Sequence, residues 1–460
     1  TMGLRPHARL QSHALLFRNV ALAAAGRRTG ANHVALAPEM HNGGSDLLVK
    51  WFVVHLASLP SGEPGGCRAA EEAFWPVHST MFGGKAMRFF PVMTLTLVVL
   101  AFLAQRSPVG AADATKFGPD PDRYQATVDR AVQFLASNQA TDGSVSPQIG
   151  IGPTALAALS MIRSGVSPDD PQVAKSLEFL REYTQESGGI HAPGSRISVY
   201  ETCIALVCFA EANRDGRYDG MLKHADRFLR DGQWGENRDK EKSDVYYGGA
   251  GYGGMSRPDL SNTAFLIEAL KASGAKADDE AIQKALVFIS RCQNLESEHN
   301  TTPFAGKVND GGFYYTPVVG RQDEERQTAA GGLRSYGSMT YSGLKSMVYA
   351  GLNEDDPRVK ATVQWIRDHY DVKNNPGMGD AGLYYYFHTF AKALDAMGVD
   401  EVEDANGVKH DWRRELAEEL ASRQQENGSW VNSNTRWMEG DPGLSTAFAL
   451  LSLSYCRPKE

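Results

Sequence analysis

Two kinds of helical segment alternate along the chain. One kind has apolar residues at three- and four-residue spacing with charges between them, which predicts helices with one solvated face. The other kind is almost wholly apolar or small and opens on a threonine suited to a first turn or cap, which predicts buried helices. The first kind comprises VDRAVQFLASNQ, VAKSLEFLREYT, MLKHADRFLRD, AIQKALVFISRCQ, VKATVQWIRDHY and WRRELAEELASRQQ; the second begins at Thr154, Thr202, Thr263, Thr340, Thr389 and Thr446.

A glycine-rich turn, often carrying an aromatic residue, joins the two helices of each pair. The turns include TDGSV, SGGI, GGYGG, NDGGFYY, GMGDAGLYYY and ENGSW. A unit of outer helix, turn and inner helix that recurs six times is typical of stacked helical hairpins. Because the inner helices are nearly uncharged and neither terminal unit looks capped, we predict an all-α fold. Its six hairpins, about twelve helices in two rings, would close into an (α/α)6 toroid.

Another apolar pattern precedes the repeats. Residues 87–112 have a basic start, an apolar run and small residues at the end, the order of a secretory signal peptide. Residues 1–86 show no helical or strand period, so we expect a non-native or disordered extension with the true start at Met81 or Met87. The toroid would then occupy residues 113–460 of an exported protein, periplasmic, envelope-bound or secreted. A signal-anchor helix is the alternative.

Charge and cysteine usage narrow the function classes. Residues 1–112 hold 10 Lys and Arg and 5 Asp and Glu, so the remainder holds 37 and 50. This acidic remainder argues against nucleic acid and anionic membrane surfaces, while peripheral membrane contact stays open. The cysteines after residue 112 have no metal-ligand spacing, so we expect buried thiols, no metal and no cofactor. They are Cys203, Cys208, Cys292 and Cys456.

The turns resemble a known family. QQENGSW (Gln424 to Trp430), NQATDGSV and a GG(F/Y)…TA pattern resemble the α/α-toroid repeats of squalene and hopene cyclases and of protein prenyltransferase β subunits. The resemblance extends over roughly residues 124–456. It implies the toroid fold and an apolar small molecule, an isoprenoid, as partner. It does not specify the oligomeric state.

The cyclase resemblance implies a proton donor. That family carries D-x-D-D directly before Thr-Ala, and the matching residues here are Asp259, Leu260, Ser261 and Asn262. A serine hydroxyl cannot protonate an alkene, so Asp259 would be a non-standard acid in a triterpene cyclase-like isomerase. The alternative is that Asp259 and Asn262 cap the helix by binding free backbone amides.

The prenyltransferase resemblance implies a zinc site made by Asp, Cys and His. Asp310 and His388 match two ligands, but Gly312 replaces the cysteine. A catalytic zinc normally takes three protein ligands, so prenyl transfer is disfavoured. Asp310 and His388 would instead bind a metal weakly or act as an acid and base pair. The alternative is that His388, at a helix start, is a cap or a satisfied polar group.

The inner-helix starts and the turn aromatics lie at the same end of the hairpins, which predicts a site on one rim of a central cavity. Aromatic rings there would bind an apolar chain or a carbocation, or else connect adjacent repeats. The candidate catalytic residues are Asp259, Asp310 and His388, and the candidate ligand-binding residues are Glu201, Asn262, Tyr252, Phe313, Tyr314, Asp380, Tyr385 and Trp437.

Three functions remain open. The first is an exported toroid that binds an isoprenoid or other apolar ligand and rearranges it. The second acts on polysaccharide with a carboxylate pair drawn from Asp310, Asp380 and Glu201. The third is a non-catalytic envelope scaffold. A closed apolar cavity would favour the isoprenoid-binding toroid, and an open acidic groove would favour action on polysaccharide. A toroid with a filled centre would favour the scaffold.

Overall fold

The structure, a computed structural model, describes residues 117–459 of the 460-residue chain. All of the described residues belong to one compact unit. The expected extension at residues 1–86 and the expected signal at 87–112 lie outside the described residues. Within 117–459, no helix has the length and apolar character needed to cross a membrane.

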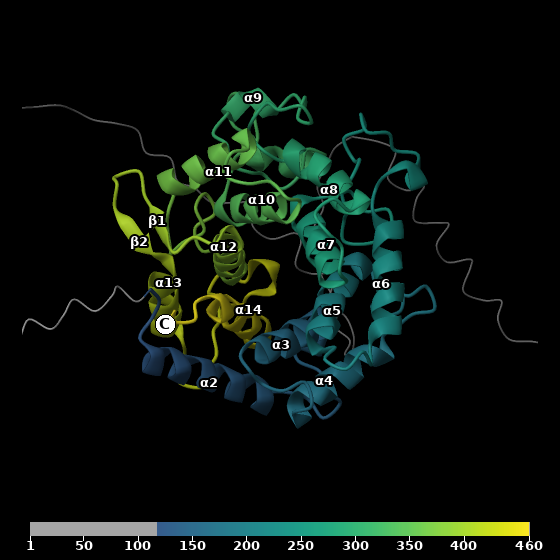
Figure 1. The fold of residues 1–460 in the computed structure, drawn as a ribbon, viewed down its shortest axis with the longest axis vertical. Coiled ribbons are helices and arrows are strands. Elements are labelled where there is room, and N and C mark those ends of the chain that lie inside the picture. Colours follow the sequence, from purple (N-terminus) through teal and green to yellow (C-terminus); the bar gives the residue numbers. More distant parts are fainter. Residues whose placement is uncertain (1–116, 460) are drawn as a thin grey trace, which may run out of the picture. The chain divides into compact units, whose positions relative to one another are not determined.

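Six helices form a closed inner ring, as the repeats predicted (Figure 1). Each contacts the next along the chain, and the last contacts the first, so the ring has no free end. These helices are α3 (Gly152–Arg163), α5 (Ser198–Ala212), α7 (Leu260–Ala272), α10 (Gly337–Tyr349), α12 (Leu383–Met397) and α14 (Pro442–Tyr455).

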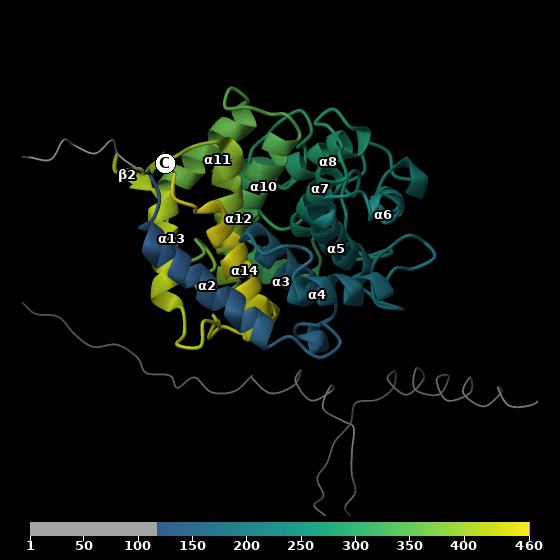
Figure 2. The same cartoon turned by 60° about the horizontal axis from the view of Figure 1, so that its bottom comes forward.

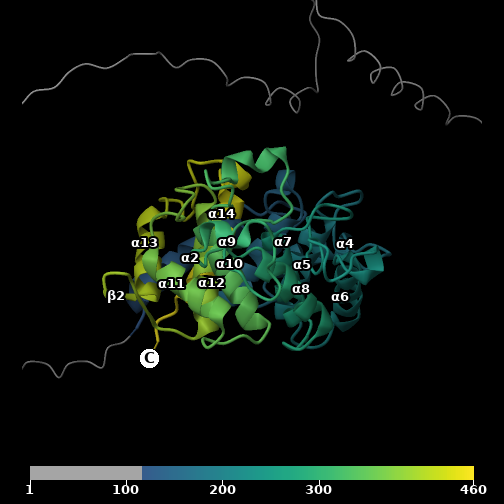
Figure 3. The same ribbon diagram turned by 90° about the horizontal axis from the view of Figure 1, so that it is seen from above.

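Six outer helices surround this ring (Figures 1 and 3), and α2 lies beside α13, where the first repeat meets the last (Figure 2). The (α/α)6 toroid is therefore confirmed. The outer helices are α2 (Pro121–Ser137), α4 (Pro171–Glu182), α6 (Asp219–Gly232), α8 (Glu280–Arg291), α11 (Pro357–Asp368) and α13 (Trp412–Arg423). An antiparallel hairpin of β1 (Glu401–Glu403) and β2 (Lys409–Asp411), and the short α9 (Ala305–Val308), are additions that periodicity did not predict.

Aspartates cap the outer helices. The side chains of the residues preceding α2, α4, α8, α11 and α13 each accept a backbone N–H from the first turn, and proline opens three of these helices. A carboxylate there binds free amides and complements the positive end of the helix dipole, while proline has no amide to leave unpaired. These caps are Asp120, Asp170, Asp279, Asp356 and Asp411.

The repeated threonines have another role. They lie inside the inner helices, mostly in or just past the first turn, and none is the capping residue. Thr202, for example, donates to the Ser198 carbonyl at 2.7 Å and accepts the Ile190 N–H at 3.0 Å. Five of the six accept such an amide from the preceding turn, and the donors are Val145, Ile190, Ala250, Phe313 and Trp430. Each hydroxyl therefore fastens a turn to its inner helix.

Glycine and glutamine join neighbouring repeats. Gly248 has φ +83°, and a Cβ there would lie 1.8 Å from the carbonyl oxygen of Lys284 in the next outer helix. Gln233 Nε2 donates to the carbonyls of Gly248 and Ala281, at 2.8 and 2.9 Å. The same joint recurs at Gln424, which bonds α2 through the Thr127 carbonyl and so closes the ring.

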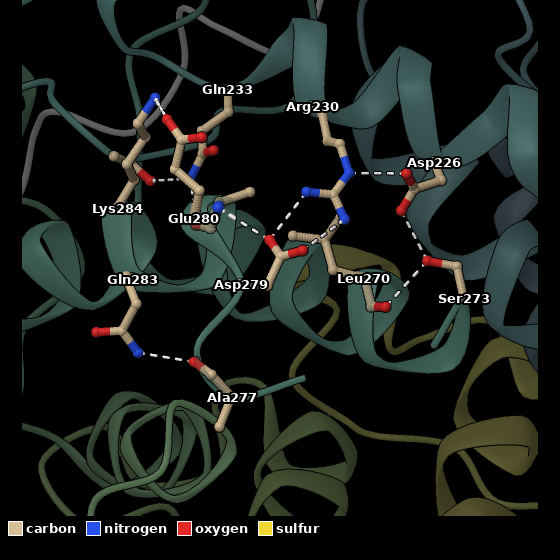
Figure 4. A network of polar contacts seen from close by, with 12 residues as sticks. Asp226, Arg230, Gln233, Leu270, Ser273, Ala277, Asp279, Glu280, Gln283 and Lys284 are labelled. Carbon is tan, nitrogen blue, oxygen red and sulfur yellow. Dashed lines mark hydrogen bonds and ion pairs between the residues drawn. The ribbon is translucent and has the colours of Figure 1, made fainter. Parts of the chain in front are cut away.

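Ion pairs strengthen the α6–α8 joint (Figure 4). Arg230 of α6 binds Asp226 on its own helix and Asp279, the cap of α8. Ser273, just after α7, donates to Asp226 at 2.7 Å. One outer helix thus connects its own repeat to the next.

Buried thiols are confirmed for Cys203, Cys208, Cys292 and Cys456, which are all free and buried.

Candidate functional site

The inner helices all run in the same direction because each follows its outer helix in the same order. Their N-termini therefore lie at one end of the lumen, the space that the inner helices enclose, and we call this end the mouth. Their C-termini lie at the other end. The predicted rim is thus one face of the toroid, and its side chains can be followed inward from the mouth.

Four aromatic rings close the lumen beneath the mouth. Ring centroids are 5.4 Å apart for Tyr200 and Phe265, 6.2 Å for Phe265 and Tyr385, and 5.8 Å for Tyr385 and Phe448. Phe265 belongs to α7 and Tyr385 to α12, which α10 separates in the ring, so this contact spans the lumen. Phe265 and Phe448 are buried, whereas Tyr200 and Tyr385 are half-buried. We call these four rings the aromatic floor.

A pair of neutral hydroxyls lies on the aromatic floor. The Ser261 and Tyr385 oxygens are 2.9 Å apart, and Ser342 approaches the same Tyr385 oxygen at 3.5 Å. Burial raises the pKa of Tyr385, so the phenol keeps its proton at neutral pH. Ser261 occupies the third position of the degenerate D-x-D-D motif, where the family places an acid. The floor therefore offers hydrogen bonds but no strong acid.

Asp259 caps α7. This is the role that the sequence offered as the alternative to a catalytic acid. Its Oδ1 accepts the Asn262 N–H at 2.9 Å, and its Oδ2 accepts from Asn262 Nδ2 at 2.7 Å. The side chain is 2 % exposed, and burial raises the pKa of Asp259 to about 6, which outweighs the hydrogen bonds that favour the carboxylate. Asp259 is therefore a carboxyl that takes up its proton in mildly acidic conditions.

Two tyrosines connect Asp259 to the mouth. Tyr315 lies close enough to Asp259 and Tyr252 to influence the pKa of both groups. The ring of Tyr252 lies 5.9 Å from Tyr200 on the aromatic floor and is 38 % exposed. Asp259 thus binds Asn262 directly, and Tyr315 lies between this pair and Tyr252 near the mouth.

Apolar side chains are exposed on two sides of the mouth. Tyr252 and Met255 lie near the start of α5, where Tyr252 packs on Tyr200, and Trp437 packs on Gly382, just before α12. Trp437 and its neighbour Met438 are 45 % and 60 % exposed, with φ of +56° and +66°. A left-handed backbone costs a non-glycine residue about 1 kcal/mol, and such strain tends to persist at functional sites.

An ion cluster lies in the lumen and was missed by sequence reasoning. Glu268 of α7 binds Lys345 of α10 through one oxygen and Lys392 of α12 through the other, and all three are at most 7 % exposed. Burial opposes ionisation of Glu268, but the two ammonium groups hold its pKa below the usual range. The expectation of nearly uncharged inner helices was wrong at these positions. The charged residues inside TAFLIEAL (Glu268), TYSGLKSM (Lys345) and TFAKALDAM (Lys392 and Asp395) were the available signal.

His388 is buried between the aromatic floor and the ion cluster. Its ring lies 5.9 Å from Phe448 and 6.2 Å from Tyr455, and its Nδ1 has no partner among the described residues. Burial lowers the pKa of His388 well below its usual value, so the imidazole is neutral.

The structure does not bring Asp310 and His388 together. Asp310 is exposed and accepts from Ser335 at 2.7 Å and from the Trp365 indole of outer helix α11 at 3.3 Å. These positions do not fit the zinc site of the prenyltransferases. Throughout residues 117–459, no group of three or more His, Cys, Asp or Glu side chains is placed to hold a metal ion.

The other predicted residues differ in placement. Phe313 and Tyr314 are buried in the joint between repeats, where the Tyr314 hydroxyl donates to the Arg291 carbonyl at 2.5 Å. Asp380 is exposed and accepts from Asn434 at 2.9 Å. Glu201 is 1 % exposed, and its Oε2 has no partner among the described residues. The turn aromatics therefore divide into those that connect repeats and those that face the mouth.

A closed double ring of helical hairpins defines this protein as an α/α toroid. Residues 151–319 match the family model of the squalene-hopene cyclase C-terminal domain. The resemblance to squalene and hopene cyclases is thereby confirmed over these residues. No curated protein matches the chain in sequence.

Several solved structures align with most of this chain at low sequence identity. The apo type II terpene cyclase MstE from Scytonema is 12% identical, with a TM-score of 0.46 over 72% of this chain and 98% of that one. Protein geranylgeranyltransferase-I from Candida albicans, complexed with GGPP, is 13% identical, with a TM-score of 0.42 over 72% and 93%. The family 76 mannosidase Bt3792 from Bacteroides thetaiotaomicron is 12% identical, with a TM-score of 0.44 over 72% and 98%.

Proposed function

We propose that this toroid binds an isoprenoid or another apolar ligand in a vestibule formed by the mouth and the aromatic floor. The aromatic floor carries the proposal, because four rings from four inner helices meet across the lumen directly beneath exposed apolar side chains. Removing such surfaces from water contributes about 25 cal/mol per Å². The hydroxyls of Ser261 and Tyr385 would orient a polar end of the ligand, such as an alcohol.

Binding is the primary role in this proposal, and rearrangement is secondary. The side chains of the aromatic floor and the ion cluster lie in the lumen, so in this proposal the ligand rests above the floor instead of threading through the ring. Ser261 cannot protonate an alkene, and the oxygens of Asp259 are engaged by Asn262. If the bound ligand is isomerised, Asp259 is the acid, and Tyr315 and Tyr252 connect it to the vestibule.

A non-catalytic interaction scaffold is the second candidate, and the contacts among inner-helix side chains across the lumen are the observation that favours it. The polysaccharide alternative has less support. Glu201 is buried, whereas Asp310 and Asp380 are exposed and accept hydrogen bonds from different segments, so no two of these carboxylates are seen to form a pair among the described residues.

Equilibrium binding of farnesol and squalene tests the vestibule. We expect Trp437→Ala and Tyr252→Ala each to weaken binding by about tenfold, which corresponds to about 1.4 kcal/mol of lost contact. Both side chains are partly exposed, so the substitutions should leave the fold intact. Val408→Ala is the matched control, because Val408 is 51 % exposed in the turn between β1 and β2, away from the mouth. Equal affinities for all variants, or no binding by the unmodified protein, would refute the vestibule.

Export through residues 87–112 is part of the same proposal. N-terminal sequencing of the protein recovered outside the cytoplasm should find a start close to residue 113. An intact start upstream of Met81 would rule out this signal.

A further inference from the structure

The buried ion cluster has more positive charge than negative. Lys345, Lys392 and Glu268 are 3 %, 5 % and 7 % exposed, and each ammonium group contacts one oxygen of the same carboxylate. No other carboxylate of the described residues contacts either lysine. Two ammonium groups carry six N–H donors, and only two acceptors are present. A buried charge without a counter-charge costs several kcal/mol, so this arrangement calls for a further anion.

Neutralisation of one lysine does not remove the imbalance at neutral pH. Burial lowers the pKa of Lys345 to about 8, so that side chain remains mostly protonated at pH 7. The neighbouring His388 adds no negative charge, because its imidazole is neutral. The Nδ1 atom of His388 is also buried and has no hydrogen-bond partner among the described residues.

A cleft of about 650 Å³ lies at the C-terminal ends of the inner helices, opposite the mouth. Tyr349 and Asp395 line this cleft within about one helical turn of Lys345 and Lys392, on the same two helices. Burial raises the pKa of Tyr349 to about 12, and the charges of Lys392 and Glu268 also act on it, so the cleft and the cluster are electrostatically close. The further basic residues of the cleft are Arg163, Arg214, Arg413, Arg457 and Lys459.

We propose that Lys345 and Lys392 bind an oxyanion, the carboxylate or phosphate group of a small molecule, that enters through the cleft at the C-terminal ends of the inner helices. Charge-assisted hydrogen bonds from ammonium groups are the strong kind, and phosphate or carboxylate oxygens would supply the missing acceptors. Glu211 and Asp395 also line the cleft and pair with Arg163 and Arg413, but the basic residues outnumber them, and this surplus of positive charge would attract the anion. The aromatic floor separates this site from the vestibule, so it is independent of the proposed function.

Thermal unfolding of the full chain with added inorganic phosphate or acetate, at constant ionic strength set by chloride, tests the site. We expect phosphate, acetate or both to raise the Tm of the unmodified protein beyond the effect of chloride. Comparison of the two shifts tells whether phosphate or carboxylate is the preferred group. Lys392→Met should reduce the affinity for that anion by at least about tenfold. Lys175→Met, on the exposed face of α4, controls for the change in net charge.

The stability of the Lys392→Met variant without phosphate or acetate distinguishes an anion-binding site from a purely structural ion pair. Lys392→Met leaves one lysine for one carboxylate, so we expect the variant to fold and to be at least as stable as the unmodified protein in chloride alone. A variant that unfolds or is clearly less stable would contradict the proposal. So would an unmodified protein that responds to neither anion beyond chloride, or a Lys392→Met variant that responds as strongly as the unmodified protein.

Discussion

The substitution Asp259→Asn probes the buried carboxyl at the start of α7. Asparagine is also a good capping residue, so its side-chain oxygen can still accept the Asn262 N–H. The second oxygen of Asp259 becomes an NH₂ group that faces the Asn262 amide. The Asn262 Oδ1 has no partner among the described residues, so a flip of that amide restores the contact. The variant therefore removes a titrating group and keeps the cap.

The sign and size of the effect follow from the pKa of Asp259. Its value is raised from 3.8 to about 6 in the folded protein. A raised pKa means that the folded state holds the proton more tightly, so the stabilisation is complete below pH 3.8 and is lost as the pH rises through about 6. A shift of roughly two pKa units corresponds to about 3 kcal/mol. Asp259 is fully buried, so solvent screening does not reduce this figure much.

Urea unfolding between pH 4 and 7.5 measures the effect. The free energy of unfolding of the unmodified protein, minus that of Asp259→Asn, should fall by up to about 3 kcal/mol across this range. Burial also raises the pKa of Glu439, but both proteins contain that carboxyl, so its contribution cancels. Ser261→Ala, two residues away, should give a profile parallel to that of the unmodified protein. A difference curve for Asp259→Asn that stays flat would refute the reasoning.

Three further predictions concern the ring and its centre. Gly248→Ala should cost at least about 3 kcal/mol of unfolding free energy, whereas Gly274→Ala, with φ +99° but nothing within 4 Å of its Cβ, should cost only about 1 kcal/mol. Equal losses in urea unfolding would show that the contact between repeats is unimportant. Thr263→Val should cost about 1 to 3 kcal/mol, because the buried Ala250 N–H loses its acceptor, and protection of that amide in hydrogen exchange should fall with it. An unchanged exchange rate would contradict that role. Glu268→Gln should cost at least about 3 kcal/mol in chloride buffer, since two buried ammonium groups lose their carboxylate, and a variant as stable as the unmodified protein would mean that the lysines are not charged.

The repeat pattern contained most of the fold. Helix periodicity predicted all twelve helices of the two rings, because amphipathic outer helices and apolar inner helices have distinct patterns. The hairpin of β1 and β2 was missed because strands of three residues are too short to show a period. The threonines were assigned to a first turn or cap. Their role in fastening the turns was missed because spacing alone cannot show that a hydroxyl accepts an amide from a distant turn.

The candidate site was predicted only in part. Asp259 was predicted because an acid precedes an inner helix, and Tyr252 was predicted because it is an aromatic residue in a turn. Both lie close to Tyr315 in the structure. Asp310 has the same sequence context, yet its turn packs against α11 and directs its carboxylate outward. The pairing of Glu268 with Lys392 across the lumen could not be predicted, since it depends on which helices face each other after the ring closes.

Native mass spectrometry of the full chain after incubation with squalene and polyprenyl phosphates tests the central claim most directly. We expect the protein to retain an isoprenoid, less of it in Trp437→Ala and an unchanged amount in Val408→Ala. A mass that stays free of ligand with every isoprenoid tried would contradict binding in the vestibule and would favour the scaffold.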